Sequence, residues 1–156
     1  MIDEGLRELY QEVILDHGKN PRNHRHPEDA NAHANGTNPL CGDRLTVFLK
    51  LGPDGRIEDA AFQGRGCAIS QASASLMTEI VRGRTEAEAD ALFDKFHRLC
   101  TDDDYVPAPD DVDEEAMERL QVLSGVRAFP TRVKCATLAW HTLNAALHGS
   151  KEVSTE

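Results

Sequence analysis

The amino-acid sequence predicts an α+β domain in which helices pack on one face of a small antiparallel sheet of about three strands. Two observations lead to this prediction. Strand-like alternation of apolar and polar residues is confined to the first half of the chain, where two such runs flank a turn. Segments with helical spacing dominate the second half, and one more precedes the strands. Strands that are followed by a run of helices are typical of α+β domains.

The first element is an amphipathic helix over residues 4–17. Its apolar positions share one face at helical spacing, and they are Leu6, Leu9, Tyr10, Val13 and Ile14. Gly18 and Pro21 then end the helix. Residues 19–40 are polar and predict a loop with one short edge strand near 31–36.

A β-hairpin follows. In residues 44–51, apolar and polar side chains alternate, with Leu45, Val47, Leu49 and Leu51 on one face, as in a half-buried strand. The Pro53-Asp54-Gly55 segment predicts a turn, because proline fixes φ and glycine tolerates a positive φ. Residues 56–63 then return as the second strand.

The remaining elements are helices. One is predicted over residues 67–82, and Gly83 ends it. Thr85 and Glu88 form a capping box for the next, which carries Cys100 on its apolar face. Residues 101–112 predict a loop, 113–123 a helix and 132–147 the last helix.

Composition and charge exclude several classes of protein. The chain has 156 residues, which fits one domain, and its net charge of −10 argues against a nucleic-acid-binding surface. The acidic residues between 101 and 115 favour a solvated loop over a docking surface for a basic partner. Asp3 and Glu4 do not fit a signal peptide, and no apolar run reaches the roughly 18 residues that span a membrane. We therefore expect a cytoplasmic protein without a membrane partner.

Three of the four cysteines occupy turns or helix starts. Cys41 precedes the first hairpin strand, Cys67 follows a Gly-x-Gly turn, and Cys135 lies near the start of the last helix, beside Lys134. A helix N-terminus stabilises a thiolate, which is the form that binds metal and attacks sulfur. In the cytosol, such cysteines are more often metal ligands or catalytic groups than disulfides.

Less specific interpretations of these residues stay open. Any one cysteine is as often a small buried hydrophobic residue as a ligand, and Asp43 is an ordinary turn residue as readily as a zinc ligand. Cys100 is predicted to lie in the core. The loop histidines His24, His26 and His33 are more readily solvent-exposed residues than a fourth ligand. His17 and His97 are predicted on helix surfaces, and His141 lies too far along its helix to share a metal with Cys135.

Five segments together resemble the SufU branch of the IscU/NifU-like family of iron–sulfur cluster assembly proteins. The first two are the opening helix and loop at residues 9–17 and 19–23. The other three are the cysteine motifs at 38–43, 64–70 and 130–140. Three cysteine motifs in this order and at compatible spacing make the resemblance specific, and it spans nearly the whole chain.

The resemblance implies a zinc ion held by Cys41, Asp43, Cys67 and Cys135. It also implies that Cys41 accepts persulfide sulfur from a SufS-type cysteine desulfurase, as a sulfurtransferase that supplies downstream iron–sulfur assembly proteins. Arg132 and Lys134 are expected around the zinc ligands. In this hypothesis a ligand from the desulfurase displaces Cys41 from zinc, and the freed thiolate attacks the outer persulfide sulfur.

Two features favour the SufU branch over the scaffold branch. Lys134 stands where scaffold proteins carry a histidine, and an inserted segment at about 84–124 separates the second and third motif cysteines. Two alternatives stay open: an IscU-like scaffold on which iron–sulfur clusters are assembled, and a module whose zinc is purely structural.

Overall fold

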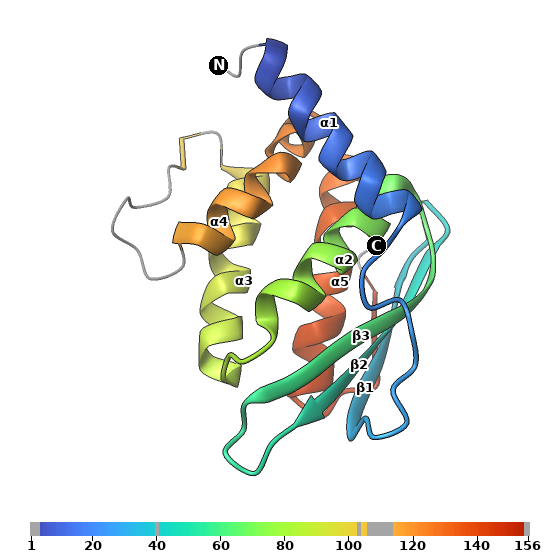
Figure 1. Cartoon of the computed structure of the whole chain (residues 1–156). Coiled ribbons are helices and arrows are strands. Elements are labelled where there is room, and N and C mark those ends of the chain that lie inside the picture. The colour runs from blue at the N-terminus through green and yellow to red at the C-terminus, as the bar shows by residue number, and fades with distance from the viewer. Residues whose placement is uncertain (1–3, 40, 103, 106–113, 155–156) are drawn as a thin grey trace.

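The computed structural model describes residues 4–39, 41–102, 104–105 and 114–154. Its elements, in chain order, are α1 (Glu4–Lys19), β1 (Ala32–Asn38), β2 (Asp43–Leu51), β3 (Ile57–Arg65), α2 (Ala68–Val81), α3 (Glu86–Thr101), α4 (Glu114–Leu120), the 3-10 helix η1 (Gln121–Ala128), α5 (Pro130–Leu147) and β4 (Glu152–Ser154). Figure 1 shows α2 and α5 against the sheet, with α3 and α4 on their far side. The predicted α+β class is confirmed.

The sheet has the strand order β3-β2-β1-β4 among the described residues. The neighbours β1, β2 and β3 pair antiparallel, as predicted. The short strand β4 was not predicted, and it pairs parallel with β1. The predicted edge strand near 31–36 therefore lies inside the sheet. Three residues are too few for an alternating pattern to reveal such a strand.

One face of the sheet builds the hydrophobic core. Leu45, Val47 and Leu49 are buried on the helix-covered face, as their alternation predicts. On the other face, Phe48 is covered by the stacked ring of His26, whose centroid lies 4.1 Å away. Trp140 of α5 is fully buried and links the core to α3 through ring contacts with Phe93 and Phe96.

The helix boundaries follow local signals. The capping box between Thr85 and Glu88 is present at the start of α3, as predicted. α5 begins earlier than predicted, at Pro130. Proline fits the first turn of a helix, because a backbone N–H in that turn has no hydrogen-bond partner within the helix. The predicted helix 113–123 is shorter as an α-helix, since η1 takes over at Gln121. Much of the acidic loop, residues 103 and 106–113, lies outside the described residues.

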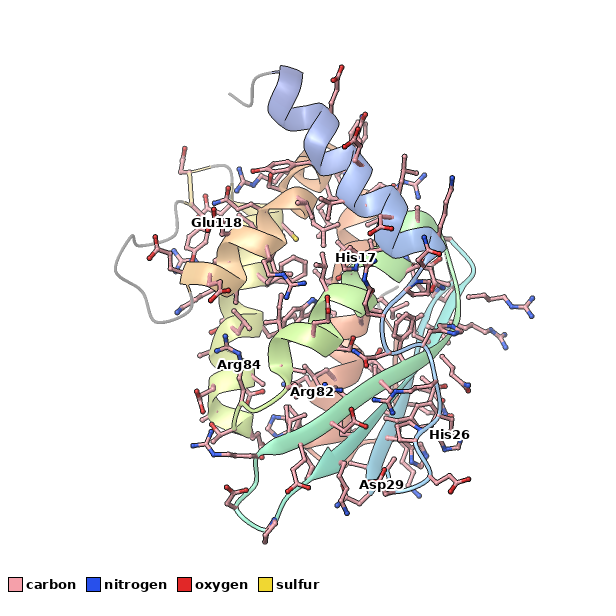
Figure 2. All side chains as sticks on the ribbon, in the orientation of Figure 1. His17, His26, Asp29, Arg82, Arg84 and Glu118 are labelled. Carbon is pink, nitrogen blue, oxygen red and sulfur yellow. The ribbon has the colours of Figure 1, made fainter. Side chains whose placement is uncertain are left out.

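The prediction that His17 lies on a helix surface is wrong. This side chain is buried, and its Nδ1 lies 2.7 Å from the Oγ of Ser75 on α2. Figure 2 shows His17 on the side of α1 that faces α2. The prediction for residues 4–17 treated only apolar side chains as buried, and it therefore missed this polar contact. Within the described part of the chain, no helix is long and apolar enough to cross a membrane.

Candidate metal and sulfur site

The first part of the site is the turn between β1 and β2. Asn38 and Asp43 are paired across the two strands, and the N–H of Cys41 donates to the carbonyl oxygen of Asn38 at 3.2 Å. Gly42 has φ +71°, a left-handed conformation that favours glycine. The turn exposes Cys41 and buries Asp43.

The second part is the connection from β3 to α2. Cys67 is the N-cap residue of α2, and its backbone N–H donates to Oδ1 of Asp43 at 3.0 Å. A Cβ atom on Gly66 would lie 2.7 Å from the same Oδ1, so only glycine lets the two segments approach this closely. Asp43 therefore joins the two turns that carry Cys41 and Cys67.

The third part is the start of α5. Cys135 is fully buried, and its thiol donates to Sγ of Cys41 at 3.3 Å. The side-chain amide of Asn38 donates to Sγ of Cys135 at 3.6 Å. Two thiols from distant parts of the sequence thus meet beside one carboxylate.

The ligand atoms of Cys41, Asp43 and Cys135 lie within 4.8 Å of one another. Oδ2 of Asp43 is buried and has no hydrogen-bond partner among the described residues. A buried carboxylate oxygen without a partner is costly unless a cation approaches it. Two thiolates and one carboxylate suit zinc, which takes sulfur and carboxylate ligands in tetrahedral sites. Cys67 lies outside this group of three, at its margin.

Cys67 interacts electrostatically with other groups of the site. Burial raises the pKa of the Cys135 thiol, with further contributions from its hydrogen bond to Cys41, from the nearby carboxylate of Asp43 and from Cys67. The interaction with Cys67, and secondly that with Cys135, raises the pKa of Arg132. Arg132 is exposed, so it stands at the solvent side of these cysteines.

The fold and the cysteine motifs are those of a known family. A model of the NifU-like N-terminal domain family matches residues 9–136. The chain belongs to this family. The alignment to the family model includes Cys41, Asp43, Cys67 and Cys135, so the site described above lies inside the NifU-like domain.

Similar proteins carry two different descriptions. The chain is 42% identical over 138 residues to the zinc-dependent sulfurtransferase SufU of Bacillus subtilis, covering 88% of each chain. It is 39% identical over 145 residues to the iron–sulfur cluster assembly scaffold protein IscU of Streptococcus pyogenes serotype M1, covering 93% of this chain and 86% of that one. A crystal structure of a protein described only as hypothetical superposes with a TM-score of 0.79 at 38% identity, covering 92% of this chain and 99% of the other. The sequence similarity thus leaves the choice between the SufU and IscU branches open.

The other sequence candidates in this NifU-like domain lie away from the three ligand atoms. Cys100 is buried in the core as predicted, and burial raises its pKa to about 12. The loop histidines His24, His26 and His33 are exposed, and the first two contact Phe62 and Phe48 instead of the cysteines. Lys134 lines a separate cavity between α3 and α5.

Sequence reasoning missed one residue of the site. Asn38 is fully buried, donates to Cys135 and leaves its own Oδ1 without a partner in the described structure. The first cysteine motif begins at this residue, so its place in the motif was the signal available. The structure gives it the role of holding the thiol of Cys135 toward the turn that carries Cys41.

Proposed function

We propose that this NifU-like protein is a zinc-dependent sulfur acceptor, which takes persulfide sulfur from a SufS-type cysteine desulfurase for iron–sulfur cluster biogenesis. One observation carries the proposal: the exposed thiol of Cys41 lies beside two buried donor groups, Cys135 and Asp43. A partner can reach such a thiol while the buried groups stay with the metal. The similarity to the Bacillus subtilis sulfurtransferase supports the same activity. A cytoplasmic location remains the expectation from the sequence.

Four residues would hold the zinc. Cys41, Asp43 and Cys135 already converge, and Cys67 completes four ligands, the number usual for zinc. Zinc in this site would supply a positive charge that keeps the thiols deprotonated and protects them from oxidation. The unpartnered Oδ2 of Asp43 supports this assignment, because the other carboxylate oxygen is already engaged by the N–H of Cys67.

Sulfur transfer would be a thiolate exchange at Cys41. Its Sγ attacks the outer sulfur of the desulfurase persulfide, and a new S–S bond forms on Cys41. The S–S bond of the donor breaks, and the desulfurase cysteine leaves as a thiolate, so no external oxidant or reductant is needed. Cys135 is too buried to meet the donor, which leaves it to hold the metal.

Arg132 would assist this step from the solvent side. Cys67 and Cys135 raise the pKa of its guanidinium, so this cation lies within reach of both sulfur atoms. An exposed cation next to the cysteines favours the approach of an anionic persulfide. Lys134, also expected near the ligands from the sequence, faces the neighbouring cavity and is assigned no part in the transfer.

The second candidate function is a scaffold on which iron–sulfur clusters are assembled. The Streptococcus pyogenes relative, which is described as such a scaffold, favours it. The same three cysteines would then bind iron and sulfide transiently. Elemental analysis of the purified protein separates the two functions: about one zinc per chain without iron supports the sulfur acceptor, whereas iron with matching sulfide supports the scaffold.

The test of sulfur acceptance is a desulfurase assay with the Cys41→Ala variant. We expect this variant to lose both persulfide formation, measured by mass spectrometry, and stimulation of the desulfurase. Cys100→Ala is the matched control, because that thiol is buried away from the site. Full stimulation of the desulfurase by Cys41→Ala would refute the proposed mechanism.

A further inference from the structure

A second cavity lies beside the helix that carries Cys135. It has a volume of about 530 Å³, within the range of small-molecule sites. Its walls come from the end of α3, from Arg127 of η1, from the first three turns of α5 and from Ser154 of β4. The wall formed by α3 belongs to the segment at 84–124 that the sequence marks as an insertion. The packing of this segment against α5 therefore contributes one wall of the cavity.

The permanently charged side chains around this cavity, Arg127 and Lys134, carry one sign of charge. Arg127, Lys134, His97 and His141 line it, and no acidic residue is among its described lining residues. The whole chain carries a net charge of −10, so the cavity is a local basic site on an acidic protein. Such a protein repels small anions in general, and only a local cluster of cations can hold one.

Contacts within the fold position Arg127, His97 and His141 at the cavity. Nε of Arg127 donates to the carbonyl oxygen of Leu99 at 2.5 Å, which fixes the guanidinium at the cavity wall. The terminal nitrogens of a guanidinium so held can still donate to an oxyanion in two parallel hydrogen bonds. The rings of His97 and His141 lie 6.5 Å apart, and the edge contact of His141 with Phe93 holds that ring in place.

The other lining groups are not reactive. Cys100 is fully buried and stays a neutral thiol near physiological pH, since burial raises its pKa to about 12. Pro130 and Val133 contribute apolar surface. The cavity therefore has the features of a binding site and lacks those of a second sulfur-accepting site.

We propose that this cavity binds a small dianion whose negative charge lies on carboxylate or phosphate oxygens. Lys134 and Arg127 are its two permanent cations, and the imidazoles of His97 and His141 add hydrogen-bond donors. A bound dianion would bridge the inserted segment and α5, next to the cysteine that α5 carries. This inference does not depend on which metal the cysteines hold or on the sulfur-acceptor function.

The test is a titration of the ¹⁵N-labelled full chain, in the metal state in which it is purified, with phosphate and, separately, with succinate, at constant ionic strength set by sodium chloride. We expect saturable changes in the amide signals of residues 97–101 and 127–141. The variant Lys134→Gln should bind about tenfold more weakly, the loss typical of one hydrogen bond to a charged group. Lys19→Gln removes the same charge from the exposed end of α1 and should bind like the unchanged protein.

Arg127→Gln is a second variant, and we expect it to weaken binding as Lys134→Gln does. Melting temperatures check that each variant is folded. Saturation by phosphate alone or by succinate alone supports the site and selects one oxyanion class. Three results would overturn the proposal. These are signal changes that sodium chloride alone reproduces, signal changes centred on other residues, and binding by Lys134→Gln and Arg127→Gln that is as tight as in the unchanged protein. Binding of an acidic peptide without binding of either dianion would also overturn it, because the occupant would then be a protein.

Discussion

At the scale of single residues, Asp43 is the group on which the site depends most. One carboxylate oxygen accepts the N–H of Cys67, and the other is buried without a partner in the described structure. A buried anion with half of its hydrogen-bonding capacity unused destabilises a fold unless a cation is present. Asp43 therefore connects the architecture of the two turns to the requirement for a metal.

We predict that two substitutions of Asp43 differ in effect. Asp43→Asn keeps an oxygen that can accept the N–H of Cys67 but removes the negative charge, so zinc should be held more weakly in an intact fold. Asp43→Ala removes both the oxygen and the negative charge, and this variant should retain zinc least. The rate at which a chelator removes zinc measures retention in the two variants. Asp59→Asn is the matched control, since that carboxylate is paired with Arg25 and Arg82 at the surface. Unchanged zinc retention in Asp43→Ala would contradict ligation by this residue.

A second prediction concerns the proton of Cys135. Burial and the hydrogen bond to Cys41 raise the pKa of this thiol, so it is protonated at neutral pH when no metal is bound. A metal binds the thiolate, so zinc binding must release this proton and the apparent zinc affinity must rise with pH. Calorimetry in buffers with different ionisation enthalpies counts the protons released. Cys100→Ala should leave the count unchanged, and a count of zero in the unchanged protein would show that the thiol is already ionised.

At the scale of elements, the way α1 joins the domain was not predictable from periodicity. His17 and Ser75 form a buried polar contact between α1 and α2, and the N–H of Arg22 donates to the same Ser75 hydroxyl at 2.8 Å. The hydroxyl can then give its own proton to Nδ1 of His17, which requires a neutral imidazole. By contrast, the capping box at Thr85 and the alternation in β2 were correctly predicted, because both are local signals.

The contact predicts a pH-dependent attachment of α1. Burial, and secondly the charge of Arg22, lowers the pKa of His17, so the unfolded chain binds a proton more readily than the folded chain. The stability that this histidine contributes is therefore complete above the unfolded pKa of about 6.5 and is lost as the pH falls below it. His17→Gln should reduce the dependence of the free energy of unfolding on pH between 5 and 7. Urea unfolding at several pH values measures this dependence.

The control for this experiment is His33→Gln, because His33 is an exposed residue of β1. This variant also loses one histidine, so it separates the effect of the buried His17 contact from the loss of an imidazole as such. His141, whose pKa burial also lowers, remains in both variants and contributes equally to each. If the free energy of unfolding depends on pH equally in His17→Gln and His33→Gln, the pKa of His17 does not differ between the folded and unfolded states.

At the scale of the whole molecule, the site joins segments that lie far apart in the chain. Cys41 and Cys135 are separated by 94 positions, yet their sulfur atoms are 3.3 Å apart. The sequence could place each cysteine at a turn or helix start, and the family resemblance could group them. It could not show that Asn38 and Asp43 are buried beside Cys135, because that depends on how α5 packs against the β1–β2 turn. The parallel strand β4 escaped prediction because it is too short to show alternation, and only the packed sheet gives it a partner.

This arrangement predicts that zinc stabilises the whole fold. Zinc bound to the β1–β2 turn, the start of α2 and the start of α5 would cross-link three segments that separate on unfolding. A ligand that binds only the folded chain at a thousand times its Kd adds about 4 kcal/mol, which for a chain of this size raises the Tm by roughly 10 °C. Calorimetric melting before and after chelation measures the shift. Cys41→Ala should keep more of this stabilisation than Cys135→Ala, because Cys41 is exposed and its neighbours can still hold the ion. A Tm that chelation does not change would show that the three segments hold together without the metal, and zinc would then serve the chemistry of Cys41 alone.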